Sequence, residues 1–312
     1  MKKIWSYFKE YHREEFHWGL YLSLAAFLAV MITLNYRIDL EDSIIDSYAG
    51  KEIRMLWYFL LYAGGYYATC LIYAWWKKDF SFFYQANFWW RSLFILIILS
   101  VHAAFYYHRL LGDFIPYKTR YFYMRTSAQL VSIFTILLPT YLFYYWKDRQ
   151  SVGSYYGLTR KDVDIKPYVW LLAAMLPLII GASFTEGFQS FYPTYRSNMF
   201  ARHFDIPEYV PALIYELAYG WDFLSVELLF RGFMVIGMVA VIGRFSVLPM
   251  VVVYAFLHFG KPAGETISSI FGGYILGIIA LYSRNIWGGV IIHMGIAWLM
   301  ELAAYLQKLP QD

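Results

Sequence analysis

The sequence predicts an all-α fold, a polytopic transmembrane helix bundle of about eight or nine spanning helices. The 312 residues are 60% hydrophobic and 15% charged, whereas soluble domains are about 45–50% apolar and about 25% charged. The apolar residues fall in stretches of roughly 17–25, each long enough to cross about 30 Å of hydrocarbon. The 31 Tyr and 12 Trp residues agree with this class, because aromatic rings with a polar edge collect at membrane–water interfaces.

Nine apolar segments are candidate spanning helices. In chain order they are 17–36, 55–76, 88–108, 127–146, 167–185, 221–242, 246–259, 266–283 and 286–306. The seventh is short, and residues 209–219 predict an additional short helix that leads into the sixth. Residues 1–16 mix charges with aromatic residues at helical spacing, which predicts a helix lying on the membrane surface or, alternatively, a solvated leader.

The polar loop 147–167 is the best internal boundary. It separates an N-terminal transmembrane extension of about four spans, 1–150, from a second region, 151–312, which holds more glycine and most of the polar residues within spans. Basic residues near Lys77 and in this loop share a side with the basic N-terminus, which predicts a cytoplasmic N-terminus. The net charge of +4 is ordinary for such a chain and indicates no nucleic-acid partner, so the lipid bilayer is the partner that composition predicts.

A charge pair interrupts the sixth span, in the sequence SVELLFRGFM (225–234). Charged groups inside a span cost about 2.5–3.5 kcal/mol each on insertion scales, so each needs an explanation. Glu227 and Arg231 lie four residues apart and therefore share one helical face. They can form an intramembrane salt bridge that fixes helix packing, or they can belong to a functional site.

Two histidines on other helices extend this polar set. His258 ends the segment YAFLHFG, and His293 lies in GGVIIHMGIAW. A Glu and two His on three helices match the ligand count of an open zinc site, with Glu227, His258 and His293 as ligands. The same three side chains also suffice for acid–base chemistry without a metal. Each histidine alone could equally be a hydrogen-bonding group of the core.

In order and spacing, VELLFRGF, YAFLHFG and GGYILGIIALYSRNIWGGVIIHMGIAW resemble the CPBP intramembrane proteases, which include the CAAX prenyl endopeptidases and bacterial bacteriocin-processing or immunity proteins. The resemblance covers roughly residues 210–305. It matches Glu227 and Arg231 to the motif EExxxR, His258 to FxxxH and His293 to HxxxN. Tyr254 stands at the Phe position of the second motif, where it keeps the ring, and is a possible auxiliary residue of the site. The resemblance therefore implies a CAAX-protease-like core in the C-terminal half.

Two positions depart from the family pattern. Val226 replaces the first Glu, which in the family activates water, and Ala297 replaces the Asn that assists oxyanion stabilisation. Three carboxylates could compensate. Asp222 lies one helical turn before Val226 on nearly the same face, and Glu301 lies one turn beyond Ala297; Glu216 sits in the preceding short helix. Each could instead serve only local structure, as a carboxylate near a helix start does.

The resemblance implies an intramembrane endopeptidase, with a membrane peptide or a lipidated protein as substrate. Glu227 would activate water or bind metal, Arg231 would orient it, and His258 and His293 would bind metal or stabilise the oxyanion. Zinc is the cofactor implied by the metalloprotease description, and a metal-free mechanism remains open beside it. The alternative is a catalytically impaired membrane binding or immunity scaffold, favoured by Val226 and Ala297. The location implied is a multi-pass position in a bacterial plasma membrane.

Overall fold

The computed structural model describes residues 2–161 and 163–308, and in these residues every regular element is helical. The longer α-helices are α1 (Lys2–Glu15), α2 (Trp18–Ile38), α3 (Ile53–Lys77), α4 (Ala86–Ala104), α5 (Tyr117–Leu130), α8 (Lys166–Ser183), α11 (Tyr209–Glu227), α13 (Val247–Phe256), α14 (Ala263–Ser283) and α15 (Trp287–Gln307). The short ones are α6 (Leu138–Phe143), α7 (Arg149–Val152), α9 (Glu186–Phe191), α10 (Met199–Phe204) and α12 (Val239–Ile242).

Eight helical stretches in the described residues are long and apolar enough to cross a membrane. They are Trp18–Ile38, Ile53–Lys77, Ala86–Phe114, Tyr117–Val152, Lys166–Ser183, Tyr209–Phe256, Ala263–Ser283 and Trp287–Gln307. This confirms the predicted all-α, polytopic bundle, and the chain is a multi-pass membrane protein.

The sixth stretch corrects the expected division of the chain. The segments 221–242 and 246–259, expected as separate spans, lie within the single stretch Tyr209–Phe256, which turns at Gly243, where φ is +64°. The expected separate short helix 209–219 is the first half of α11 and continues to Glu227 without a break. Hydropathy shows apolar length, but it does not show that 209–219 and the start of 221–242 belong to one helix, α11.

α13 and the π-helical segment Leu228–Gly237 form the centre of the bundle, and all ten residues of each are buried. α3 and α14 pack against α13, and α14 also contacts the π-helical segment. Ten residues of α-helix rise only about 15 Å, half of the hydrocarbon thickness. α13 is therefore a core helix that ends at Phe256, and the predicted extension to 259 is replaced by a turn that contains His258.

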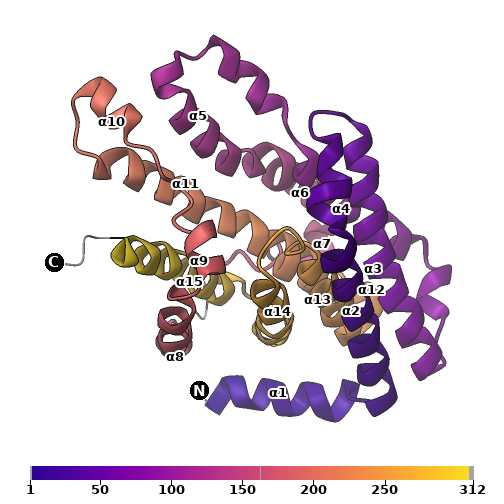
Figure 1. The fold of residues 1–312 in the computed structure, drawn as a ribbon. Helices are drawn as coiled ribbons and strands as arrows, with labels where there is room; N and C mark the ends of the chain where they lie inside the picture. The colour runs from indigo at the N-terminus through magenta and orange to yellow at the C-terminus, as the bar shows by residue number, and fades with distance from the viewer. Residues whose placement is uncertain (1, 162, 309–312) are drawn as a thin grey trace.

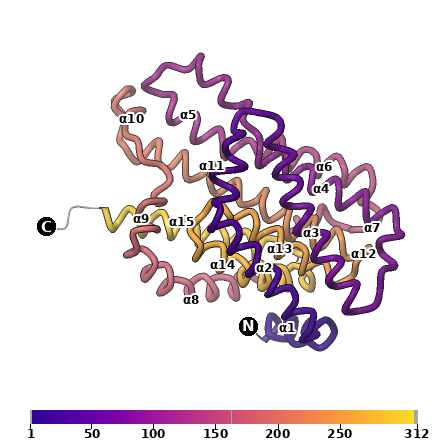
Figure 2. Tube along the Cα trace, turned by 45° about the vertical axis from the view of Figure 1, so that its right-hand side comes forward, coloured from indigo at the N-terminus to yellow at the C-terminus, as the bar shows by residue number. Residues whose placement is uncertain are grey.

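The remaining helices surround this centre (Figure 1). α2, α3 and α4 stand together on one side, whereas α8 and α15 pack against each other on the other side, and both views agree on this division (Figure 2). Gly288 and Gly295 permit the contact between α8 and α15. A Cβ on Gly288 would overlap Tyr168 of α8, and a Cβ on Gly295 would overlap Leu172 of α8. This is the close approach for which small residues are suited.

α1 is the helix expected in residues 1–16, and it lies across one end of the bundle (Figures 1 and 2). Ile4 and Phe8 pack towards α8 and α14, and the ring of Tyr7 stacks on Tyr282 at 5.3 Å. Trp5 on the same helix is exposed. A helix with one face packed and an aromatic side chain exposed fits the surface-helix expectation better than a solvated leader.

The loop at 147–167 packs tightly onto the centre of the bundle. Tyr156 lies so close to the π-helical segment that a Cβ on Gly232 would be 2.8 Å from its carbonyl oxygen. Asp148, with no exposed surface, binds Arg91 of α4 through two contacts of 2.7 Å. Arg91 also donates to the carbonyl of Gly237, at 3.0 Å. These contacts fix the loop and α4 to the π-helical segment.

Candidate functional site

Glu227 occupies the junction between two kinds of helix. It is the last residue of α11, and the π-helical segment begins at Leu228. π-helical turns are uncommon and occur frequently at functional sites. The Glu227 side chain has no exposed surface, and its neighbours along the chain are apolar, so any ionised state depends on partners inside the bundle.

Arg231 is the charge partner that the spacing predicts. Its Nη1 lies 3.0 Å from Oε1 of Glu227, and its side chain is 1% exposed. The guanidinium carbon lies 4.3 Å from the ring centroid of Tyr254, in cation–π distance. Nε of Arg231 has no hydrogen-bond partner in the part of the chain that the structure describes. The pair is therefore close in distance but incompletely satisfied.

His293 of α15 shares the same carboxylate oxygen. Its Nδ1 donates to Oε1 of Glu227 at 3.1 Å. A Cβ built on Gly289, one turn earlier on α15, would overlap Oε2 of Glu227. Oε2 has no hydrogen-bond partner within the described ranges. Glycine at 289 thus lets α15 come close enough for its histidine to reach the carboxylate.

Tyr254 closes the chain of contacts from the opposite side. Its hydroxyl lies 3.3 Å from Nε2 of His293. Because Nδ1 of His293 donates to a carboxylate, the neutral imidazole has its lone pair on Nε2. The Tyr254 hydroxyl therefore donates to that nitrogen. Glu227, His293 and Tyr254 form a continuous carboxylate–imidazole–hydroxyl arrangement.

His258 lies beside this arrangement, in the turn after α13. Its Nδ1 donates to the carbonyl oxygen of Tyr254 at 2.8 Å, and the two rings meet edge to face at 4.7 Å. Because a carbonyl only accepts, Nε2 of the neutral His258 carries the free lone pair. Thr266 donates to the His258 carbonyl at 2.6 Å, and Asn35 donates to that of Phe259 at 3.0 Å. α2 and α14 thus hold the turn in place.

The described residues do not fit a metal ion as they are arranged. No group of three or more His, Cys, Asp or Glu side chains in residues 2–161 and 163–308 is placed to hold one. Oε1 of Glu227 is already shared by Arg231 and His293, and Nε2 of His293 faces a hydroxyl. The expected zinc ligation by Glu227, His258 and His293 has no support in this geometry and stays a prediction.

The two positions that depart from the family motifs are both at least partly buried. Val226 is partly buried and packs against the main hydrophobic core. Ala297 is 5% exposed and lies one turn after His293 on α15. Neither position brings a polar group to the cluster.

Of the three carboxylates that could compensate, Asp222 has a charge interaction with a histidine of the cluster. His102 and His293 are both within coulombic range of it. No hydrogen bond joins Asp222 to Glu227, Arg231 or His293 in the described residues, and its Oδ1 has no partner there. It therefore lies beside the cluster without joining its hydrogen-bonded chain.

Glu301 and Glu216 belong to a different polar group. Glu301 accepts from the backbone N–H of Thr194 at 3.0 and 3.1 Å and from its hydroxyl at 2.7 Å. Arg125 donates to the Thr194 carbonyl at 2.7 Å. Glu216 lies within coulombic range of Glu301. Glu301 lies two turns beyond His293 on α15. Its hydrogen bonds hold the loop that carries Thr194 in place.

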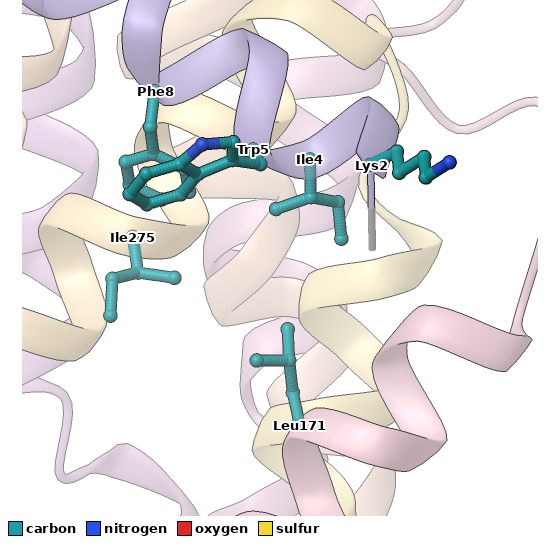
Figure 3. A pocket seen from close by; sticks show the side chains of 6 residues that line it. All are labelled: Lys2, Ile4, Trp5, Phe8, Leu171 and Ile275. Atoms are coloured by element: carbon teal, nitrogen blue, oxygen red, sulfur yellow. The ribbon is translucent and has the colours of Figure 1, made fainter.

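Two cavities lie outside the polar cluster. An apolar cavity of about 590 Å³ opens between α1, α8 and α14 (Figure 3) and is lined by Lys2, Ile4, Trp5, Phe8, Leu171 and Ile275. A more polar cavity of about 320 Å³ lies near the ends of α3 and α4, with Glu41, His102 and Leu257 in its lining. Leu257 precedes His258, so the second cavity reaches the edge of the candidate site.

Eight apolar helical stretches around a buried carboxylate–imidazole cluster define the class of this protein, a multi-pass membrane protein with groups for acid–base chemistry inside the bundle. Residues 206–299 match the family model described as type II CAAX prenyl endopeptidase, Rce1-like. The match confirms the resemblance to the CPBP family, and the C-terminal half of the chain carries an Rce1-like domain. No curated protein and no solved structure matches the chain.

Sequence reasoning missed two features of this site. Tyr254 was expected as an auxiliary residue for its ring alone, and the contact of its hydroxyl with His293 was not foreseen. The contact between Gly289 and Glu227 was also missed, because Gly288, Gly289 and Gly295 look alike in the sequence and only one of them faces a carboxylate. Motif spacing indicates which residues are candidates for the site, whereas the rotation of each helix about its axis determines which side chains they contact.

Proposed function

We propose that this protein is an intramembrane endopeptidase that hydrolyses a peptide bond in a membrane-embedded or lipid-anchored substrate. The observation that carries the proposal is the 3.1 Å hydrogen bond from His293 Nδ1 to Glu227 Oε1, buried inside an apolar bundle. An imidazole oriented by a carboxylate is a general base of the kind that acyl-transfer enzymes use. The Rce1-like match over residues 206–299 supports the same reaction class.

In the proposed reaction, a water molecule replaces the Tyr254 hydroxyl as the donor to Nε2 of His293, and Nε2 then takes a proton from that water. The resulting hydroxide oxygen forms a bond to the scissile carbonyl carbon, and the carbonyl π electrons move onto its oxygen. Glu227 stabilises the imidazolium that forms, because its carboxylate accepts from Nδ1. Arg231 places a positive charge 3.0 Å from that carboxylate and holds it in its orientation.

The reaction ends when the C–N bond breaks and the leaving amine takes the proton from Nε2 of His293. This returns His293 to its neutral form and gives one carboxylic acid and one amine for each water consumed. His258 keeps Nε2 free for the substrate, since Nδ1 is occupied by the Tyr254 carbonyl. As imidazolium it donates to the oxyanion, and as neutral imidazole it accepts from a substrate N–H.

The test is a cleavage assay with purified protein in lipid vesicles. Two probes distinguish the substrate classes: a farnesylated peptide ending in a Cys-aliphatic-aliphatic-X sequence, and an unlipidated single-span peptide. We expect one of them to be cleaved, and Glu227→Gln, His258→Ala and His293→Ala each to abolish cleavage. Glu216→Gln, a carboxylate of the same helix outside the hydrogen-bonded chain, is the matched control and should retain activity.

The expected zinc can be measured in the same preparations. Metal analysis of protein purified without chelator, compared between wild type and His258→Ala, decides whether a metal accompanies the site. Bound zinc that is lost in His258→Ala supports the metalloprotease form. An active protein without zinc supports the acid–base form.

A binding or immunity scaffold is the second candidate function. Val226 in the hydrophobic packing and Ala297 in a buried position favour it, because both family groups at these positions are lost. A scaffold would bind one of the two peptides without cleaving it. Its affinity would be the same in wild type and in Glu227→Gln.

A further inference from the structure

Tyr254 contacts three other residues of the candidate site: Arg231, His258 and His293. Its hydroxyl lies 3.3 Å from Nε2 of His293, and its ring lies 4.3 Å from the guanidinium carbon of Arg231. Its carbonyl accepts from His258 at 2.8 Å. The side chain is 5% exposed. A phenylalanine would preserve the ring contacts and the carbonyl, so only the hydroxyl requires a separate explanation.

The ring has little freedom to carry the hydroxyl elsewhere. Phe230 packs edge to face against it at 5.1 Å. On the α14 side, a Cβ built on Gly273 would lie 3.1 Å from Cδ1 of the ring. Arg231 lies over the ring face. The hydroxyl is therefore held near Nε2 of His293, which is the atom that the proposed reaction uses.

The hydrogen-bond count at Nε2 changes during that reaction. In the neutral state Nε2 accepts from the Tyr254 hydroxyl. Once His293 has taken a proton from water, Nε2 carries hydrogen and can no longer accept. The hydroxyl of Tyr254 then needs another acceptor, since an unpaired buried donor is costly. The carbonyl oxygen that becomes negative in the same step is such an acceptor.

We propose that Tyr254 is a catalytic residue whose O–H donates a hydrogen bond to the oxyanion of the tetrahedral intermediate. The proposal rests on the proposed endopeptidase function. No proton is transferred from Tyr254, so the balance of atoms is unchanged: water supplies its proton to His293, and the leaving amine receives it. The hydroxyl gives the site a donor that Ala297 cannot supply, and a donor aimed at developing charge is among the strongest catalytic devices.

The test is Tyr254→Phe, which removes one oxygen atom and retains the ring. We expect kcat to fall 10²- to 10³-fold at unchanged KM, the usual effect of deleting one oxyanion donor. The melting temperature in detergent should stay within about 2 °C of wild type. A binding readout accompanies the assay: a phosphinic peptide with a tetrahedral centre should bind wild type at least tenfold more tightly than Tyr254→Phe, whereas the uncleaved peptide should bind both equally.

A rescue variant separates catalysis from structure. Ala297→Asn places an amide donor one turn beyond His293, and in the Tyr254→Phe background it should recover at least tenfold in kcat. If wild type cleaves and Tyr254→Phe has the same kcat, the role of Tyr254 is wrong and the endopeptidase function stands. If wild type cleaves neither peptide and binds the phosphinic peptide no better than Tyr254→Phe does, both proposals are overturned.

Discussion

Two arginine–carboxylate pairs are buried in this bundle, and they differ in how completely their atoms are paired. Arg91 and Asp148 join α4 to the segment before α7, with side chains 9% and 0% exposed. Glu227 and Arg231 lie at the centre of the Rce1-like domain, with side chains 0% and 1% exposed. Burial is thus nearly the same in both pairs and does not distinguish them.

The first pair is well supplied with partners. Arg91 and Tyr156 both donate to Oδ2 of Asp148 at 2.7 Å. Oδ1 of Asp148 lies 2.7 Å from Nη2 of Arg91 as an ion pair but has no hydrogen-bond partner in the described residues. Arg91 also donates to the Gly237 carbonyl. Such a network fixes geometry, because each group is oriented by more than one bond.

In the second pair, Glu227–Arg231, several polar atoms have no hydrogen-bond partner in the described residues. Oε2 of Glu227 and both Nε and Nη1 of Arg231 have no hydrogen-bond partner in the residues that the structure describes, whereas Oδ1 of Asp148 is the atom in this state in the first pair. Oε1 of Glu227 forms the ion pair with Arg231 and also accepts the hydrogen bond from His293. Incompletely paired buried groups are rare in native proteins and call for an explanation, of which a catalytic role is one. The first pair is thus tied to its surroundings by more hydrogen bonds, and the second pair has more buried polar atoms without a hydrogen-bond partner.

The largest expected effect is on activity at the second pair. Glu227→Gln combined with Arg231→Met removes both charges, so no unpaired charge stays buried. Cleavage should fall about 10⁴-fold, as when the carboxylate that orients a catalytic histidine is neutralised. The melting temperature should change little, because apolar replacement of a whole buried pair is often neutral. Cleavage above one tenth of the wild-type rate would contradict the assignment of this pair.

The next effect is on stability at the first pair. Arg91→Met leaves Asp148 buried without its cation, and should lower the free energy of unfolding by about 3–5 kcal/mol. Thermal and denaturant unfolding in detergent micelles measures this. The matched control is Arg202→Met, whose partner Glu208 is exposed and 4.0 Å away, and which should lose less than about 1 kcal/mol. Equal losses in the two variants would show that the buried Arg91–Asp148 pair contributes no more stability than an exposed pair.

A smaller effect is expected at the glycine behind Glu227. Gly289→Ala places a Cβ on Oε2 and forces the carboxylate to move, so kcat should fall about 10²-fold, the usual result of a displacement near 1 Å. Gly272→Ala on α14 is the control, because nothing lies within 4 Å of its Cβ position. It should keep full activity and gain up to about 1 kcal/mol in stability. Unchanged kcat in Gly289→Ala would show that the Glu227 position is not critical.

The smallest effect concerns a third carboxylate, Glu41, in the loop between α2 and α3. Burial raises its pKa from 4.5 to about 7, and Tyr58 donates to it at 2.6 Å. Because the folded state holds the proton more tightly, this group stabilises the fold below pH 4.5, and that contribution is lost as pH rises to about 7. The loss should be of the order of 1 kcal/mol, allowing for partial exposure.

Melting temperatures measured between pH 5 and 8 test whether stability falls as pH rises. Wild type should lose stability across the window, and Glu41→Gln should not. Glu208→Gln, an exposed carboxylate, should retain the wild-type slope. A parallel slope in all three proteins would exclude Glu41 as the titrating group.

The sequence predicted the class of fold well, because spanning length and hydropathy are local properties. It also identified Glu227, Arg231, His258 and His293 from motif spacing, and the structure brings Glu227, Arg231 and His293 into direct contact. The Arg91–Asp148 pair could not be foreseen, since 57 residues separate its members and both lie in the N-terminal extension and its boundary loop.

The auxiliary carboxylates show a second limit. Asp222 and Glu301 were each placed one turn from a departing position, which fixes their helical face but not what that face meets. Glu301 meets the backbone of Thr194, and Asp222 has charge interactions with His102 and His293. Helical periodicity gives a direction around an axis, whereas tilt and rotation against neighbouring helices come from packing of the whole bundle.

The π-helical winding of Leu228–Gly237 has a consequence for how this chain tolerates change in length. Hydrogen bonds from each residue to the fifth one along hold more residues per turn than α-helical bonds to the fourth. Loss of one residue here would let the segment rewind as an α-helix and would turn Glu227 relative to everything that follows Gly237. The number of residues in this segment, more than their chemistry, thus sets the direction in which the carboxylate faces His293.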